Sequence, residues 1–178
     1  MKTRLVLLFL CASLIPAVQA FAKTILPDAC GDDSVKFDVK TLKDPPAPAP
    51  PAVGKAQIVF IGSMERSGSI FIGGAPETRV GMDGAWVGVN KGNSYFVLNV
   101  TAGEHHLCTV WGKKVGVASL SAEVGKVYYF EAKAKVKIHR YGNGSMEKDT
   151  DLTFTQVDED EGKYRIKASE LATSTPNK

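Results

Sequence analysis

Polar and apolar residues alternate with a period of two along most of the chain after Lys55. The alternation is clearest at residues 126–138, where one face carries small or apolar side chains: Tyr128, Phe130, Ala132, Ala134, Val136 and Ile138. The other face carries mostly charged side chains: Tyr129, Glu131, Lys133, Lys135 and Lys137. A segment with one apolar and one charged face predicts a half-buried antiparallel strand rather than a helix.

Shorter alternating segments surround this strand and are separated by turns that contain glycine. They lie at residues 34–40, 55–62, 94–100, 103–111 and 150–157. Many short strands at such spacing predict a mainly β fold, and we expect an antiparallel β-sandwich of the immunoglobulin-like or jelly-roll-like kind. Residues 101–104 predict a hairpin turn between two of these strands.

The sandwich domain is expected to span residues 55–157. After it, Asp158 followed three residues later by Glu161 has the spacing of a capping box and predicts a short helix within residues 158–178. A final strand through residues 164–166 is the competing interpretation. A disordered tail is expected at the end of the chain.

Residues 1–20 have the pattern of a secretory signal peptide: two basic residues, an apolar stretch, and small residues at positions 18 and 20. Cleavage is expected after Ala20, with a second choice after Ala22. The apolar stretch is shorter than the roughly 18 to 20 residues that span a bilayer, and no other stretch approaches that length. Cys11 follows Phe and Leu instead of small residues, so lipid anchoring is not expected. We therefore predict an exported protein, periplasmic or secreted, without a transmembrane segment.

Removal of the signal changes both the cysteine count and the charge. It leaves Cys30 and Cys108, and two cysteines in an oxidising compartment predict a disulfide. The formal net charge of +3 falls to +1 because Lys2 and Arg4 are lost. A nearly neutral chain gives no basis for nucleic-acid binding.

An N-terminal extension, residues 21–54, ends in a proline-rich stretch. Residues 44–54 contain five prolines and favour an extended, semi-rigid polyproline conformation. One interpretation is a spacer that holds the domain away from a surface or partner. The other is an ordinary linker between structural elements.

The clustered glycines of residues 78–92 do not form a phosphate-binding loop, because a strand follows them where such a loop needs a helix. Asp83-Gly84 instead predicts a two-residue type I′ hairpin turn. The resulting register opposes Val80 to Val87. It places five apolar side chains on the core face: Val80, Met82, Ala85, Val87 and Val89.

Trp86 lies on the other face of this hairpin, opposite Gly81. Arg79 is diagonal to it and within reach of a cation–π contact. With Asn90 at the rim, Trp86 and Arg79 form a candidate binding surface for a sugar ring or an extended peptide. In the competing interpretation, a second sheet, the N-terminal segment or the C-terminal helix covers Trp86.

Residues 103–108, GEHHLC, concentrate chemically reactive side chains. Because side chains alternate along a strand, the adjacent histidines point to opposite faces and cannot chelate one ion together. His106 and Cys108 share a face and underlie the alternative of a metal-dependent or thiol enzyme. A four-ligand zinc site would also need Cys30 and His139. A Cys30–Cys108 disulfide beside packed histidines is the favoured interpretation, so no metal, cofactor or catalytic residue is predicted.

Two stretches, RVGMDGAWVGVNKGNSYFVLNVTAGEHHLC at 79–108 and AEVGKVYYF at 122–130, resemble the bacterial domain-of-unknown-function 2846 family. The matching elements are Val80, Asp83, Gly84, Gly88, Tyr95, Gly103, His105 or His106, and Leu107. The resemblance covers residues 55–138 and implies a small exported β-sandwich, often lipid-anchored, with no established activity, cofactor or catalytic residue. This chain departs from the family by lacking a convincing lipidation cysteine.

We therefore expect a non-catalytic module of the cell envelope that binds or displays, with a glycan or protein partner. Lys133, Lys135 and Lys137 form a basic stripe that could contact an anionic surface. The favoured interpretation of the stripe is a solvated face or a protected sheet edge.

Overall fold

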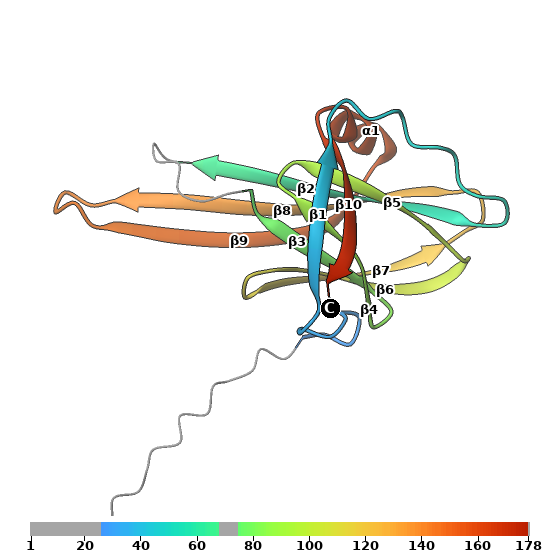
Figure 1. Cartoon of the computed structure of the whole chain (residues 1–178), viewed down its shortest axis with the longest axis horizontal. Helices are drawn as coiled ribbons and strands as arrows, with labels where there is room; N and C mark the ends of the chain where they lie inside the picture. Colours follow the sequence, from blue (N-terminus) through green and yellow to red (C-terminus); the bar gives the residue numbers. More distant parts are fainter. Residues whose placement is uncertain (1–25, 68–74, 178) are drawn as a thin grey trace, which may run out of the picture.

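The computed structural model describes residues 26–67 and 75–177. Ten strands and one helix follow one another along this part of the chain (Figure 1): β1 (Lys36–Leu42), β2 (Ala56–Ser67), β3 (Glu77–Met82), β4 (Ala85–Lys91), β5 (Ser94–Val100), β6 (Gly103–Trp111), β7 (Lys114–Ala122), β8 (Val127–Arg140), β9 (Met146–Val157), α1 (Glu159–Lys167) and β10 (Glu170–Asn177). The predicted signal peptide lies outside the described residues.

The strands form two sheets that pack against each other, which confirms the predicted β-sandwich. The larger sheet has the order β1-β10-β5-β2-β8-β9, and the smaller one has the order β4-β3-β6-β7. Most neighbours are antiparallel, but β2 pairs in parallel with β8, and β10 with β5. The prediction of a purely antiparallel strand at residues 126–138 is therefore wrong on one side: β8 is antiparallel to β9 and parallel to β2.

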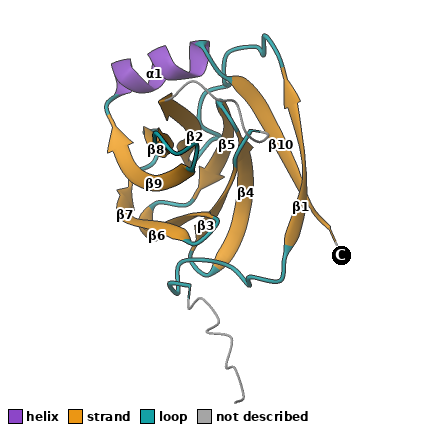
Figure 2. Ribbon diagram, turned by 90° about the vertical axis from the view of Figure 1, so that its left-hand side faces the viewer, coloured by secondary structure: helices purple, strands orange, loops and turns teal. Residues whose placement is uncertain are grey.

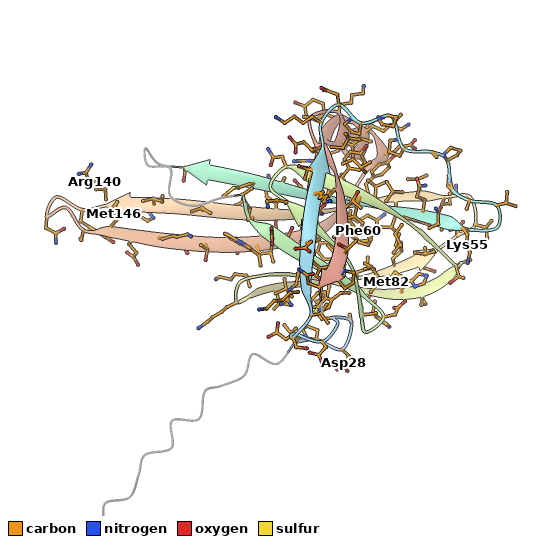
Figure 3. The ribbon with its side chains drawn as sticks, viewed as in Figure 1. Asp28, Lys55, Phe60, Met82, Arg140 and Met146 are labelled. Atoms are coloured by element: carbon orange, nitrogen blue, oxygen red, sulfur yellow. A yellow bond between two sulfur atoms is a disulfide. The ribbon has the colours of Figure 1, made fainter. Side chains whose placement is uncertain are left out.

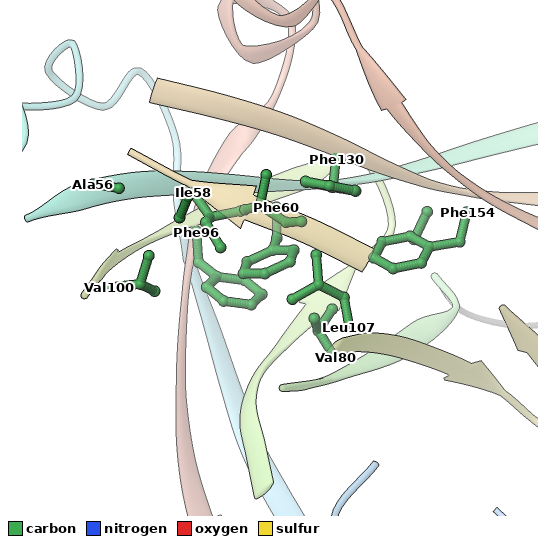
Figure 4. Close-up of a cluster of buried hydrophobic side chains, with 12 residues drawn as sticks. Ala56, Ile58, Phe60, Val80, Phe96, Val100, Leu107, Phe130 and Phe154 are labelled. Atoms are coloured by element: carbon green, nitrogen blue, oxygen red, sulfur yellow. The ribbon is translucent and has the colours of Figure 1, made fainter. Parts of the chain in front are cut away.

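A core of buried apolar side chains lies between the sheets (Figure 4). Four phenylalanines from adjacent strands of the larger sheet form a row, with ring centroids 5.1 to 6.3 Å apart: Phe96, Phe60, Phe130 and Phe154. Figure 3 shows Phe60 in the middle of the molecule. Such spacings suit tilted aromatic pairs, so the row contributes directed contacts in addition to buried area.

A third layer covers the outer face of the larger sheet (Figure 2). It consists of α1 and residues 44–51, which we name the proline strap and which run from β1 past α1 toward β2 (Figure 1). Asp158 caps α1 as predicted, because its Oδ1 accepts a hydrogen bond from the backbone N–H of Glu161 at 2.8 Å. Gly162 lets the helix approach the sheet closely, since a Cβ there would lie 2.3 Å from Cγ of Tyr129.

The first and the last strand of the described chain, β1 and β10, pair with each other in the larger sheet. The strand predicted at residues 34–40 is confirmed as β1, but it pairs with β10 along its whole length and so belongs to the sandwich rather than to an extension. The disordered tail expected at the C-terminus is wrong, because these residues form β10. Residues 164–166, for which a strand was the competing interpretation, lie in α1, and the strand β10 follows the helix. No helix in the described part is long and apolar enough to reach across a membrane.

Residues 101–102 connect the two sheets. The hairpin turn predicted here is wrong, because β5 lies beside β2 in the larger sheet and β6 lies between β3 and β7 in the smaller one. Phe96 of β5 and Leu107 of β6 belong to the same buried cluster. The two strands therefore face one core from opposite sides instead of sharing a hydrogen-bond ladder.

The outer face of β8 is only partly exposed. Tyr129 and Glu131 are buried on the side that α1 covers, although their face was predicted to be charged and solvated. Further along, the ammonium groups of Lys133 and Lys135 lie 3.6 and 3.9 Å from a carboxylate oxygen of Glu65 in β2. Because β8 lies between β2 and β9, these lysines do not protect a sheet edge.

The β3–β4 hairpin turns where it was predicted to turn. Asp83 and Gly84 have φ angles of 52° and 86°, as a type I′ turn requires. Beyond the turn the predicted register is wrong, because Val87 is an extra residue in a β-bulge and Val80 opposes Gly88. A Cβ on Gly88 would lie 2.6 Å from the ring of Phe96, so a glycine is needed at this inward position.

The bulge decides which side chains of β4 face the core. Val87 packs against the core between the sheets and Trp86 against the cysteines, so these two residues lie on opposite faces as predicted. Val89 opposes Arg79 and lies on the outer side, where it is nevertheless buried. Asn90 is 0% exposed and contacts the larger sheet. Val89 is therefore buried as predicted, although on the side of β4 that Arg79 shares, and the predicted rim position of Asn90 is wrong.

Candidate functional site

The histidines of GEHHLC fasten one hairpin to its neighbouring strand. His105 is buried, with Nδ1 at 2.7 Å from Oδ2 of Asp83 and Nε2 at 3.0 Å from the carbonyl oxygen of Thr101. The side chain of His106 is exposed, and its backbone N–H donates to Oδ1 of Asp83 at 2.8 Å. The carboxylate of the β3–β4 turn thus holds two consecutive residues of β6.

The charges of this pair follow from its geometry. Both ring nitrogens of His105 face acceptors, so both hydrogen bonds form only when the imidazole is doubly protonated. Burial disfavours that charge, but the Asp83 carboxylate and the Thr101 carbonyl outweigh it and raise the pKa of His105 above 6.5. Burial likewise opposes the Asp83 carboxylate, yet its hydrogen bonds to His105 and His106 lower its pKa below 3.8. The His105–Asp83 pair, which we name the clasp, therefore has a structural role, because it joins the β3–β4 turn to β6.

Cys108 and Cys30 form the predicted disulfide, with their Cα atoms 5.5 Å apart. Cys108 is fully buried, and both sulfurs lie in a small apolar cluster with Val110. Neither sulfur carries the free thiolate that nucleophilic catalysis or zinc binding requires. In the described part of the chain, no three His, Cys, Asp or Glu side chains are grouped as metal ligands would be.

Trp86 does not form an open platform. The N-terminal segment lies on it, since a Cβ on Gly31 would lie 2.5 Å from the indole ring. The indole N–H donates to the carbonyl of Asp32 at 2.7 Å. The guanidinium of Arg79 lies 4.5 Å from the ring centroid, which confirms the cation–π contact, and it also pairs with Asp33 at 2.6 Å. Trp86, Arg79 and Asn90 therefore do not come together as an exposed binding surface.

A cavity of about 710 Å³ lies between the proline strap and the outer face of the larger sheet. The strap forms one wall along its full length, and the side of α1 that carries Ile166 forms another. The strap is tied to the sheet at its C-terminal end, because Nε2 of Gln57 donates to the carbonyl of Ala49 and the N–H of Ala52 donates to Oδ1 of Asn99, each at 3.0 Å. Small-molecule sites in proteins commonly measure about 300–1,000 Å³.

Two tyrosines form much of the cavity floor. Tyr95 of β5 and Tyr129 of β8 are 2% and 6% exposed and lie on the same face of the sheet, on either side of β2. Neither hydroxyl has a hydrogen-bond partner among the residues that the structure describes. Burial raises the pKa of both phenols above 10, so both are neutral donors at physiological pH. The rings of both tyrosines are buried, and their hydroxyls are free to bind water or a ligand in the cavity.

The charged groups of the cavity wall are mainly basic. Lys163 and Lys167 are four residues apart on α1 and therefore lie on the same side of the helix. Lys163 pairs with Glu159 at 2.5 Å, whereas Lys167 forms no ion pair within the described part of the chain. Asp44, where the strap begins, is the acidic side chain of the lining.

A second buried polar cluster fixes α1 on the sheet beside the cavity. Glu131 is 5% exposed and accepts hydrogen bonds from Arg165 at 2.7 Å and from the hydroxyl of Ser63 at 2.5 Å. Arg165 also pairs with Glu161 at 2.6 Å. This cluster therefore positions the helix that forms the cavity wall.

Tyr95, Tyr129 and the two lysines were not predicted from the sequence as site residues. A signal for a covered outer face was present in residues 58–61, which are apolar at four consecutive positions. A strand with apolar residues on both faces is typical of a sheet that is covered on both sides.

Comparison with protein-family models, with curated proteins and with solved structures gave no match for this chain. The resemblance to the domain-of-unknown-function 2846 family therefore stays a prediction, based on the turn and core positions given above.

Proposed function

We propose that the protein is an exported, non-catalytic binding module of the cell envelope whose ligand site is the cavity beneath the proline strap. The observation that carries this proposal is a cavity of about 710 Å³ into which two tyrosine hydroxyls open, neither of them hydrogen-bonded to a described residue.

The rest of the molecule supports a binding role. The disulfide suits an oxidising compartment, in agreement with the signal-like N-terminus. The reactive residues of GEHHLC serve in the disulfide and in the clasp with Asp83. The proline strap belongs to the cavity wall, so its role is that of a linker between β1 and β2 that also shapes the site.

The test uses a neutral dye, N-phenyl-1-naphthylamine, whose fluorescence rises in apolar surroundings. We expect the dye to bind the mature, disulfide-bonded protein at one saturable site. Val127 lies in the cavity wall at the start of β8, so Val127→Trp fills part of the volume and should remove the fluorescence increase.

Val117→Trp is the matched control, because Val117 is 59% exposed on β7 and does not line the cavity. This variant should bind the dye like the parent protein. No saturable dye binding by the parent, or equal loss in both tryptophan variants, would overturn the assignment of the site. N-terminal sequencing of the exported protein tests the compartment separately, and a start at Phe21 or Lys23 is expected.

A further inference from the structure

Apart from the carboxylate of Asp44, every polar side chain that lines the cavity can donate a hydrogen bond. The two phenols can each donate one hydrogen bond, and the ammonium groups of Lys163 and Lys167 are donors only. Lys163 lies close enough to Tyr129 for its positive charge to favour the phenolate, although burial outweighs this effect on the pKa. The Tyr129 phenol and the Lys163 ammonium therefore lie at the α1 side of the cavity, and Lys167 lines the same side one helical turn further on.

The remaining lining is apolar. The prolines of the strap form one wall, and Val127 and Ile166 continue the apolar surface onto β8 and α1. Proline rings have no N–H groups, so this wall offers no backbone donors at those positions to a polar ligand. The cavity thus combines a donor-rich, basic part with an apolar surface.

We propose that the cavity binds a single-chain anionic amphiphile, with its apolar chain against the proline strap and its anionic group near Lys167 and Tyr129. This inference rests on the proposed function and names the ligand class of that same site. A volume of about 710 Å³ suits one ligand of ordinary small-molecule size rather than a two-chain lipid. Glu159 already neutralises Lys163, so Lys167 supplies the unpaired positive charge.

The test is displacement of N-phenyl-1-naphthylamine by four compounds with the same twelve-carbon chain, each kept below its micelle-forming concentration. Dodecanoate and dodecyl phosphate are anionic, dodecanol is neutral, and dodecylamine is cationic. We expect both anions to displace the dye at concentrations about tenfold lower than dodecanol, because a hydrogen bond to a charged group contributes about 1.5–3 kcal/mol. The tighter of the two anions identifies the head group.

Two variants assign the interaction to residues. Lys167→Gln should weaken both anions about tenfold and leave dodecanol unchanged. Lys148→Gln is the matched control, since Lys148 is exposed on β9 and does not line the cavity. Tyr129→Phe keeps the ring that packs on Gly162 and removes only the hydroxyl, and it should weaken the anions several-fold.

Equal displacement by all four compounds, preference for dodecylamine, or equal effects of K167Q and K148Q would overturn the ligand class. In each of these cases the dye still binds, so the cavity keeps its binding role. Absence of dye binding by the parent protein would instead remove the proposed function itself.

Discussion

Replacing Gly162 by alanine tests how α1 is held on the sheet. At an exposed helical position this change stabilises a protein by about 1 kcal/mol, because alanine is the better helix former. Here the added Cβ would lie 2.3 Å from Cγ, 2.4 Å from Cδ1 and 2.8 Å from Cβ of Tyr129. Ordinary carbon–carbon contacts lie at about 3.5–4.0 Å, so the helix must move outward by roughly 1 Å.

That movement also stretches the 2.7 Å contact between Arg165 and Glu131, and overpacking in a protein interior costs about 1–3 kcal/mol. After the gain of about 1 kcal/mol in helix propensity, we expect Gly162→Ala to lower the free energy of unfolding by up to about 2 kcal/mol. Urea unfolding at pH 7, followed by far-ultraviolet circular dichroism, measures this difference directly.

A double-mutant cycle separates the clash from other effects of the substitution. Tyr129→Ala removes the two ring atoms nearest to the new Cβ, so Gly162→Ala should cost at least about 1 kcal/mol less in that background. If Gly162→Ala instead stabilises the parent protein, as it would on an exposed helix, α1 does not sit directly on Tyr129. The wall of the cavity would then be misplaced as well.

Three further predictions concern the smaller sheet. Replacing both Cys30 and Cys108 by serine removes a disulfide between residues 78 positions apart and should lower the free energy of unfolding by about 4 kcal/mol. Urea unfolding of the oxidised parent and of the variant measures this difference. Trp86→Ala should lower it by roughly 2 kcal/mol, because the indole is half covered by the N-terminal segment; an unchanged melting temperature would show that the segment does not rest on Trp86. His105 has a raised pKa in the folded state, so the stability contributed by its charged form is fully present below pH 6.5 and is lost as the pH rises through the folded-state pKa. Asp83 has a lowered pKa in the folded state, so the stability contributed by its carboxylate is fully present above pH 3.8 and is lost as the pH falls through the folded-state pKa. The difference in melting temperature between the parent and His105→Gln should therefore be largest between about pH 4 and pH 6.5 and should shrink at higher pH; a difference independent of pH would contradict the charged pair.

The parts of this fold that the sequence predicted are those decided by neighbouring residues. The Asp83-Gly84 turn needs positive φ angles that this dipeptide readily adopts, and the Asp158 cap needs only the backbone three residues later. The alternation of apolar residues likewise located most strands. Each of these features depends on contacts within a few positions of the chain, so each leaves a readable local pattern.

The errors came from contacts between distant residues. The bulge at Val87 turns Gly88 toward Phe96, which belongs to the other sheet, and no local pattern in β4 reports that encounter. The C-terminal residues look like a polar tail, yet β1 supplies them with a pairing partner more than 120 positions earlier in the chain. The N-terminal segment covers Trp86 for the same kind of reason, since the Cys30–Cys108 bridge holds it there.

The cavity itself follows from a mismatch between the sheet and its cover. Six strands at about 4.8 Å spacing make a face roughly 24 Å wide, and a nine-residue helix is only about 13 Å long. The helix covers part of that face, where Gly162 rests on Tyr129. Beside it runs the proline strap, whose five prolines lack backbone donors and cannot pair with the sheet as a strand would. The space between these two incomplete covers is the cavity.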